Sequence, residues 1–176
     1  MAQELGLAEP TLPWHVERVR IAAIADAAAT LAGALGKVGR DVALLAQAEV
    51  GELREGGDAS GASSAMPHKR NPVASVAIVA CAERIPGLLS TLHASMLPEL
   101  ERGAGSWHAE WGPWSDLLRL TGSAAAWARD LLENLEVDGS RMRANLESAA
   151  APSSSGTGSV EAAATWIDRA LAAHGA

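Results

Sequence analysis

The sequence predicts an all-α protein organised as a bundle of long helices, and three observations support this prediction. Alanine and leucine are abundant, while phenylalanine and tyrosine are both absent. Three long stretches place apolar residues alternately three and four positions apart, which on a helix gives one apolar stripe. Glycine-rich and polar segments separate these stretches. A chain of 176 residues is long enough for a real core. We expect a long-helix bundle at 1–136 and a short C-terminal helical region at 137–176.

The first helix is expected to follow an irregular lead-in that contains two prolines. It should begin at Trp14 and end near Glu49. Gly33, Gly36 and Gly39 weaken it locally, and they permit a neighbouring backbone to approach closely. The apolar stripe predicted to face partner helices consists of Ile21, Ile24, Ala28, Leu31, Leu35, Val38, Val42 and Leu45.

The second helix is expected to begin at Pro72 with Asn71 as its cap. Asparagine accepts hydrogen bonds from free N–H groups, and proline needs no N–H in the first helical position. Pro86 lies inside this helix and should cause a kink rather than an end. The helix should end around Pro98. Its stripe is Ile78, Cys81, Ile85, Leu88, Leu92 and Met96, widened by Val73, Val76, Val79 and Leu89.

A third helix is predicted from Trp107 to Leu135, again with apolar residues at alternating spacings of four and three, and Pro113 near its start indicates a bend. The three stripes are too wide for a single antiparallel helical hairpin to cover. We therefore expect the helices to bundle across subunits in a homo-oligomer.

The C-terminal region is expected to hold two further helices. The first is short, at about 140–149. Residues 152–159 (PSSSGTGS) form a low-complexity linker. A final amphipathic helix is predicted at about 160–174.

Charge and cysteine content restrict the setting of the protein. The formal net charge of −7 argues against nucleic acid as a partner, because phosphate binding needs a basic surface. Cys81 is the single cysteine, so an internal disulfide is impossible and a reducing compartment is expected. No apolar run is expected to reach membrane-spanning length, and the N-terminus lacks a signal-peptide pattern. We expect a soluble cytoplasmic protein with no membrane partner.

The stretch 51–72 contains the strongest chemical motif in the sequence. A glycine-rich run, which cannot be regular helix, leads into two hydroxyls and three residues that can carry positive charge. The stretch then enters the positive end of the second helix, where free N–H groups and the helix dipole attract anions. A carboxylate-rich guest is therefore expected, and the alternative is a solvated loop between helices. The polar residues concerned are Ser63, Ser64, His68, Lys69 and Arg70.

This stretch resembles the signature loop of the fumarase/aspartase superfamily, Gly-Ser-Ser-x-Met-Pro-x-Lys-x-Asn-Pro. The match runs from Ser63 to Pro72 and departs at Ala62, where the family usually has glycine. The resemblance implies Ser63 as the catalytic base, with its alkoxide stabilised by N–H groups and by Lys69, which is the second catalytic residue. It implies substrate binding by Ser64, Met66, His68 and Asn71, and no cofactor.

A second constellation is Trp107-His108-Ala109-Glu110-Trp111, with Trp114 one turn further on. One interpretation is a set of core tryptophans. Adenylosuccinate lyases carry serines and an arginine after a similar Trp-His, and their absence here argues against a nucleotide substrate. The string instead resembles the 3-carboxy-cis,cis-muconate cycloisomerases, which adds Trp107 and His108 to the implied substrate-binding residues. The same family is similar to this chain at Pro13-Trp14-His15 and at 167–174.

The resemblance covers nearly the whole chain but only about the second half of the usual family member. It implies a cycloisomerase that converts 3-carboxy-cis,cis-muconate to 4-carboxymuconolactone in protocatechuate (β-ketoadipate) catabolism and that is inactive without the N-terminal half. It also implies a homotetramer in which three subunits build each active site around a small polycarboxylate. Two alternatives stay open: a fumarate-releasing lyase such as adenylosuccinate lyase, and a non-catalytic helical assembly module.

Overall fold

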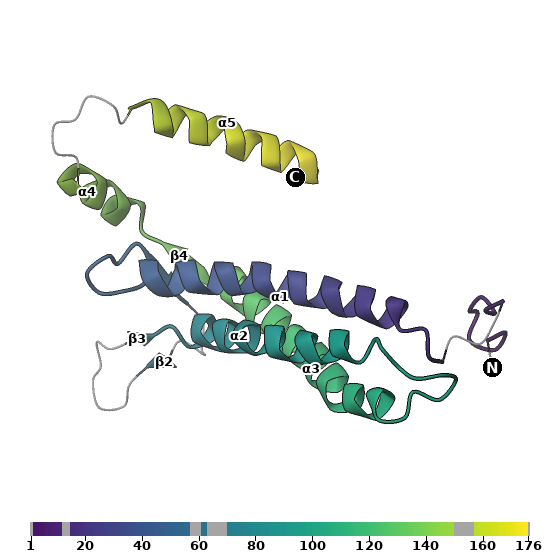
Figure 1. Ribbon diagram of the computed structural model, residues 1–176. Helices are drawn as coiled ribbons and strands as arrows, with labels where there is room; N and C mark the ends of the chain where they lie inside the picture. The colour runs from purple at the N-terminus through teal and green to yellow at the C-terminus, as the bar shows by residue number, and fades with distance from the viewer. Residues whose placement is uncertain (1, 12–14, 57–60, 63–69, 150–156, 176) are drawn as a thin grey trace. The chain divides into compact units, whose positions relative to one another are not determined.

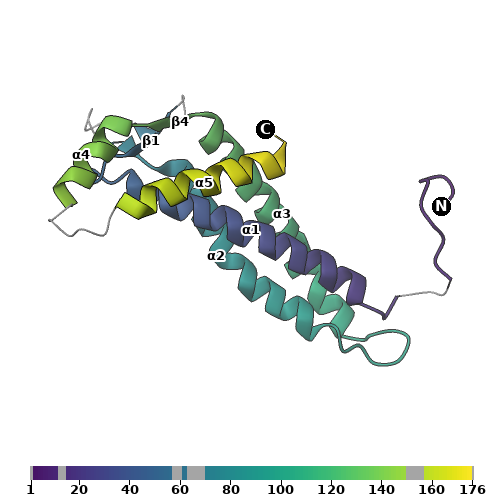
Figure 2. The same ribbon diagram turned by 90° about the horizontal axis from the view of Figure 1, so that it is seen from above.

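The computed structural model confirms an all-α bundle of long helices. It describes residues 2–11, 15–56, 61–62, 70–149 and 157–175. The three long helices α1 (Val19–Leu45), α2 (Val73–Ala94) and α3 (Ser106–Glu133) lie side by side (Figures 1 and 2).

The chain divides into two compact units, Met1–Asp138 and Gly139–Ala176. The first unit holds the three long helices. The second holds α4 (Gly139–Ala149) and α5 (Thr157–His174), which correspond to the two C-terminal helices expected from the sequence.

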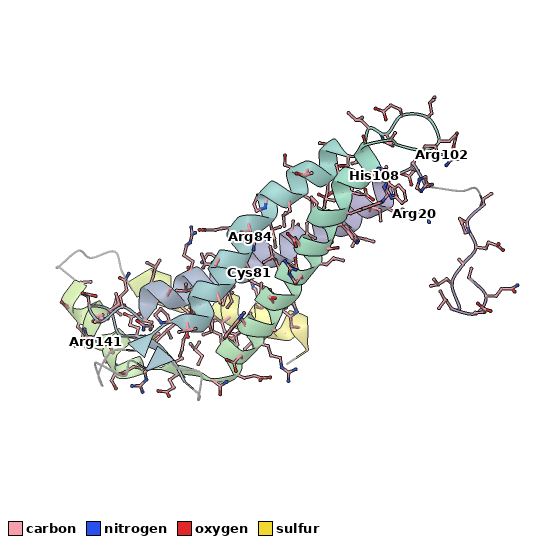
Figure 3. The ribbon with its side chains drawn as sticks, turned by 90° about the horizontal axis from the view of Figure 1, so that it is seen from below. Arg20, Cys81, Arg84, Arg102, His108 and Arg141 are labelled. Atoms are coloured by element: carbon pink, nitrogen blue, oxygen red, sulfur yellow. The ribbon has the colours of Figure 1, made fainter. Side chains whose placement is uncertain are left out.

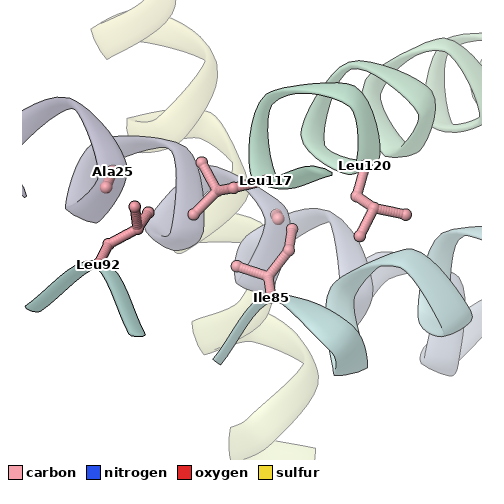
Figure 4. Close-up of a cluster of buried hydrophobic side chains, with 6 residues drawn as sticks. Ala25, Ile85, Leu92, Leu117 and Leu120 are labelled. Carbon is pink, nitrogen blue, oxygen red and sulfur yellow. The ribbon is translucent and has the colours of Figure 1, made fainter. Parts of the chain in front are cut away.

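The core of the first unit consists of two clusters of buried apolar side chains, one toward each end of the bundle. All three long helices contribute to both clusters. One cluster is formed by Ala25, Ala32, Ile85, Leu92, Leu117 and Leu120 (Figure 4). The other is formed by Val42, Ala74, Ile78, Ala128 and Leu131.

The packed face of α1 differs from the predicted one. Its buried residues are mostly alanine and glycine: Ala22, Ala25, Ala32, Gly39 and Val42. Ile24 and Leu31, which belong to the predicted stripe, are 51% and 48% exposed. Small side chains allow close packing here: a Cβ added to Gly36 would lie 2.7 Å from the Cβ of Ala82 on α2. Ile24 and Leu31 therefore do not pack against the other long helices of this chain, and the expected contact of these two positions with partner helices stays a prediction.

The helix boundaries shift by a few residues from the expected ones. Helix α1 begins at Val19 rather than Trp14 and ends at Leu45. Helix α2 continues through Pro86, as expected, and ends at Ala94 rather than near Pro98. Local sequence patterns fix helix ends poorly because the last turns fray and depend on their neighbours.

Among the described residues, four short strands that the sequence did not predict form two small antiparallel sheets. Strand β1 (Leu53–Glu55) pairs with β4 (Leu135–Val137), and β2 (Gly61–Ala62) pairs with β3 (Arg70–Asn71). Strands of two or three residues are too short to show an alternating pattern. Both sheets lie at the end of the bundle where α2 begins.

Helices α1 and α2 are long and apolar enough to cross a membrane by length and composition alone. The expectation that no apolar run reaches this length is therefore wrong, because alanine-rich helices count as apolar. The observation is weak evidence for a membrane, since the core helices of soluble proteins meet the same criterion.

Candidate functional site

The signature stretch is the connection of a small β-hairpin. Strands β2 and β3 pair with Gly61 opposite Asn71 and Ala62 opposite Arg70. The chain therefore leaves the hairpin after Ala62 and returns at Arg70, one residue before Asn71. Asn71 lies at the base of this connection, directly before α2, and its side chain is exposed. Ser63, Ser64, Met66, His68 and Lys69 lie outside the described residues.

Glu55, on β1, caps the start of α2. Its Oε2 accepts a hydrogen bond from the backbone N–H of Ala74 at 3.0 Å. Its Oε1 accepts hydrogen bonds from the backbone N–H of Ser75 at 2.9 Å and from the Ser75 hydroxyl at 2.6 Å. Glu55 is 8% exposed. A carboxylate accepting N–H bonds is a strong cap, because it meets both the unpaired donors and the helix dipole.

This arrangement corrects two expectations about α2. Pro72 occupies the cap position rather than the first helical position, and its side chain offers no hydrogen bond. Asn71 is not the cap, because Glu55 receives the N–H groups of Ala74 and Ser75. The N–H of Val76 bonds to the carbonyl of Pro72 at 3.0 Å. The helix start is thus not an open anion site, since a carboxylate of the same chain already fills it.

The small β1–β4 sheet holds Glu55 in place. The two strands pair antiparallel, with Glu55 opposite Leu135, and the side chain of Arg54 forms an exposed ion pair with Glu136. The N–H of Gly56 also donates to the carbonyl of Asn134 at 2.9 Å. A Cβ at Gly56 would collide with that carbonyl, so glycine is required where β1 ends. The segment after α3 therefore fixes the residue that caps α2.

The second constellation lies at the opposite end of the bundle. The rings of His15 and Trp107 meet edge to face at 4.6 Å between centroids, and Trp107 meets Trp111 in the same way at 5.2 Å. His108 contacts both tryptophans. Trp111 is half-exposed and His108 is exposed. His108 lies near the end of the bundle where Arg102, in the connection between α2 and α3, is also found (Figure 3). Of the three tryptophans, Trp114 packs against a core cluster, as the core interpretation expects.

A buried ion pair supports this aromatic group. Arg18, just before α1, contacts Glu110 on α3 through two guanidinium nitrogens, with Nε 3.1 Å from Oε2. A third nitrogen of Arg18 donates to the backbone carbonyl of His15 at 3.0 Å. Glu110 belongs to the Trp107–Trp111 string, and Arg18 follows Pro13-Trp14-His15 by three positions. Neither was predicted as a site residue, because their pairing depends on the packing of α1 against α3.

Within one chain, Asn71 and the Trp107-His108 pair do not meet. Asn71 precedes the first residue of α2, whereas Trp107 is in the first turn of α3, after α2 has ended. Helix α2 has 22 residues, so the two groups are separated by roughly 33 Å at 1.5 Å per residue. They could serve one site only if different subunits supplied them.

A groove of about 370 Å³ runs along the middle of α1 and α2. Its two lining cations are paired: Lys37 with Asp41 on α1, and Arg40 with Glu83 on α2. The groove lies away from both ends of the bundle, and its charges are matched, so it adds no residue to the candidate site. Within the described ranges, no group of three or more His, Cys, Asp or Glu side chains is placed to hold a metal ion.

Comparisons with known proteins agree with the fold and with the family resemblance. A family model described as a lyase matches residues 2–87. The chain is 53% identical over 147 residues to a 3-carboxy-cis,cis-muconate cycloisomerase of Pseudomonas aeruginosa, covering 83% of this chain and 32% of that protein. It is also 53% identical over 147 residues to a nitrosuccinate lyase of Streptomyces davaonensis, with 83% and 31% covered.

Among solved structures, a 3-carboxy-cis,cis-muconate lactonizing enzyme from Pseudomonas putida matches with a TM-score of 0.76 and 46% identity, covering 83% of this chain and 32% of that one. The resemblance to lyases of the fumarase/aspartase superfamily is thus confirmed. More narrowly, the chain is homologous to part of the 3-carboxy-cis,cis-muconate cycloisomerases. It spans about a third of the length of these relatives, rather than the half expected from the sequence.

Proposed function

We propose that this chain supplies the signature-loop portion of a cofactor-independent cycloisomerase that converts 3-carboxy-cis,cis-muconate to 4-carboxymuconolactone in the cytoplasm. The observation that carries the proposal is the 53% identity over 147 residues to an enzyme of that name. In this reaction one carboxylate oxygen adds to an alkene carbon, and a proton enters alpha to another carboxylate. The difficult step is the formation of a doubly charged aci-carboxylate, the intermediate between addition of the oxygen and entry of the proton.

The residues of the signature stretch suit that step. A cation and N–H donors placed where the negative charge grows lower the barrier, and losing one such donor costs roughly 3–4 kcal/mol in well-studied enzymes. Lys69 supplies the cation and the Asn71 amide supplies donors for a substrate carboxylate. Ser63 is the proposed base of the reverse direction, in which its alkoxide removes the alpha proton; in the forward direction its hydroxyl returns that proton to the aci-carboxylate. Ser64, Met66 and His68 contact substrate or anchor the loop. The pairing of β2 with β3 supports this proposal, because it holds Asn71 opposite Gly61 at the two ends of the signature stretch.

A homotetramer with shared active sites forms part of the proposal. The Trp107-His108 pair of one subunit shares a site only with the signature stretch of another subunit. Within one chain, helix α2 separates the pair from the stretch. Exposed apolar residues on two helices favour assembly. These residues recur at intervals of seven or fourteen positions: Ile24 and Leu31 on α1, and Trp111, Leu118 and Leu132 on α3.

A second candidate is an elimination reaction on a substituted succinate. A nitrosuccinate lyase is as similar in sequence as the cycloisomerase, at 53% identity over 147 residues. Both substrates carry several carboxylates, so the same cation and amide could serve either. A nucleotide substrate is less favoured, because the segment after Trp107 lacks the serines and arginine expected for a phosphate.

The test is turnover by the purified chain, alone and after mixing with the remaining portion of the Pseudomonas aeruginosa relative. Disappearance of 3-carboxymuconate is followed by ultraviolet absorbance, and loss of nitrosuccinate is followed in parallel. Lys69→Met should reduce the rate by orders of magnitude, and Arg84→Met, on the exposed side of α2, should leave it unchanged. Turnover of neither substrate under either condition would favour the non-catalytic module.

A further inference from the structure

Glu55 is a buried carboxylate that lies outside the family match from Ser63 to Pro72 and that the proposed reaction does not use. Its two oxygens receive three hydrogen bonds from Ala74 and Ser75 at the start of α2. Unpaired N–H groups at a helix start are the donors that ordinarily bind anions. Here the anion is the side chain of Glu55, which precedes Ala74 by 19 residues and Ser75 by 20 residues in the sequence.

The burial of this carboxylate makes the two partners depend on each other. A buried carboxylate without donors is costly, and buried N–H groups without an acceptor are costly as well. Only Pro72 separates the first turn of α2 from Asn71, which pairs with Gly61 at the base of the signature stretch. Anything that fixes this turn also fixes the place at which the stretch returns to the helix.

We propose that Glu55 is a positioning residue for the candidate site. Its carboxylate fixes the first turn of α2 and the adjoining Asn71, and it closes the helix start to substrate carboxylates. A bound polycarboxylate is then recognised by side chains such as that of Asn71 rather than by the N–H groups of Ala74 and Ser75, which already donate to Glu55. Only the statement about substrate rests on the proposed function.

The experiment is a chemical rescue of Glu55→Ala. Alanine retains the Cβ, and the atoms removed from the side chain correspond to acetate. The midpoint of thermal unfolding should fall by roughly 2–8 °C, from the loss of a helix cap in a chain of this size. Sodium acetate should restore at least half of the loss, because it binds only the folded variant, and sodium chloride at the same ionic strength should not. The unsubstituted chain should show no acetate-specific gain.

Two variants serve as controls. Glu136→Ala removes another glutamate of the same small sheet, whose exposed ion pair with Arg54 should matter little; acetate should not change its stability. Glu55→Gln fills the same space but places an amide nitrogen against a backbone N–H. It should be destabilised without acetate rescue, because no cavity is left. If Glu55→Ala folds only in acetate, the proposal is supported; no acetate-specific gain, or Glu55→Gln as stable as the parent chain, overturns it.

Binding of tricarballylate, a saturated tricarboxylate, connects this cap to substrate recognition. We expect Glu55→Ala to weaken its binding about tenfold, a change of about 1.4 kcal/mol. Equal or tighter binding by the variant would overturn the positioning role. If the parent chain binds neither tricarballylate nor 3-carboxymuconate while acetate still rescues Glu55→Ala, the proposed function fails and the internal cap remains.

Discussion

Arg18 and Glu110 form a two-point ion pair between residues 92 positions apart in the sequence, and their side chains are only 11% and 7% exposed. The pair joins the segment before α1 to the first turns of α3. Arg18 also donates to the carbonyl of His15, whose ring contacts Trp107. The ion pair therefore holds the segment before α1 against the aromatic cluster of His15, Trp107, His108 and Trp111.

Glu110→Ala should lower the free energy of unfolding by about 3–5 kcal/mol, because it leaves the buried guanidinium of Arg18 without a counter-charge. Urea denaturation with tryptophan fluorescence measures this change, and the nearby Trp107 and Trp111 should report it. The double variant Arg18→Met/Glu110→Leu should be more stable than Glu110→Ala, since no unpaired buried charge remains.

Glu83→Ala is the matched control for Glu110→Ala. Glu83 pairs with Arg40 across α1 and α2, but both side chains are exposed. Its removal should cost less than about 1 kcal/mol. Equal losses for Glu83→Ala and Glu110→Ala would show that burial does not distinguish the two ion pairs.

Two glycines of α1, one turn apart, should respond to alanine in opposite directions. An added Cβ at Gly33 meets no atom within 4 Å, so Gly33→Ala should stabilise the helix by about 0.4–1 kcal/mol. At Gly36 the same Cβ would lie 2.7 Å from the Cβ of Ala82, so Gly36→Ala should destabilise by about 1–3 kcal/mol. Thermal unfolding of both variants gives the comparison. Adding Ala82→Gly to Gly36→Ala should recover part of the loss, and a stabilising Gly36→Ala would contradict the close approach of α1 and α2.

Asn71→Ala tests the part of the candidate site that the structure describes. The side chain is exposed, so the free energy of unfolding should change by no more than about 0.5 kcal/mol. Affinity for 3-carboxymuconate should fall by roughly tenfold or more, from loss of a hydrogen bond to a charged group. Isothermal titration measures the affinity. Unchanged affinity would remove Asn71 from the site, whereas a large loss of stability would assign it a structural role.

The sequence predicted the helices well, because their apolar spacing is regular over many turns. It did not indicate which face of α1 packs within this chain. Ile24 and Leu31 are the larger and more apolar residues, so hydropathy assigns them to the core. The observed contact instead uses Ala25 and Ala32, because small side chains let α1 and α2 approach closely. Hydropathy patterns measure apolarity and carry no information about the distance between helices.

The candidate site was predictable only where its residues are contiguous. The motif around Asn71 could be identified from the order of residues alone. Glu55 could not, because its role as a cap requires β1 to pair with β4, whose residues lie about 80 positions away in the sequence. A local pattern favours Asn71 as the cap, but the distant carboxylate accepts the N–H groups of Ala74 and Ser75. Ser63 and Lys69 lie outside the described residues, and their roles stay predictions.

The exposed apolar stripe of α1 leads to the last prediction. If Ile24 and Leu31 pack against another subunit, Leu31→Asp places a charge in that contact and should weaken self-association by roughly a hundredfold or more, given 1.5–3 kcal/mol for a buried leucine and the added cost of the charge. Leu44→Asp is the matched control, because Leu44 is 52% exposed on the same helix but points about 140° away at 100° per residue. Light scattering after size exclusion gives the mass of each variant over a range of concentrations. We expect the parent chain and Leu44→Asp to share one oligomeric mass and Leu31→Asp to be smaller. A monomeric parent chain at every concentration would contradict the assembly, and equal dissociation of both variants would show that the interface is not confined to this stripe.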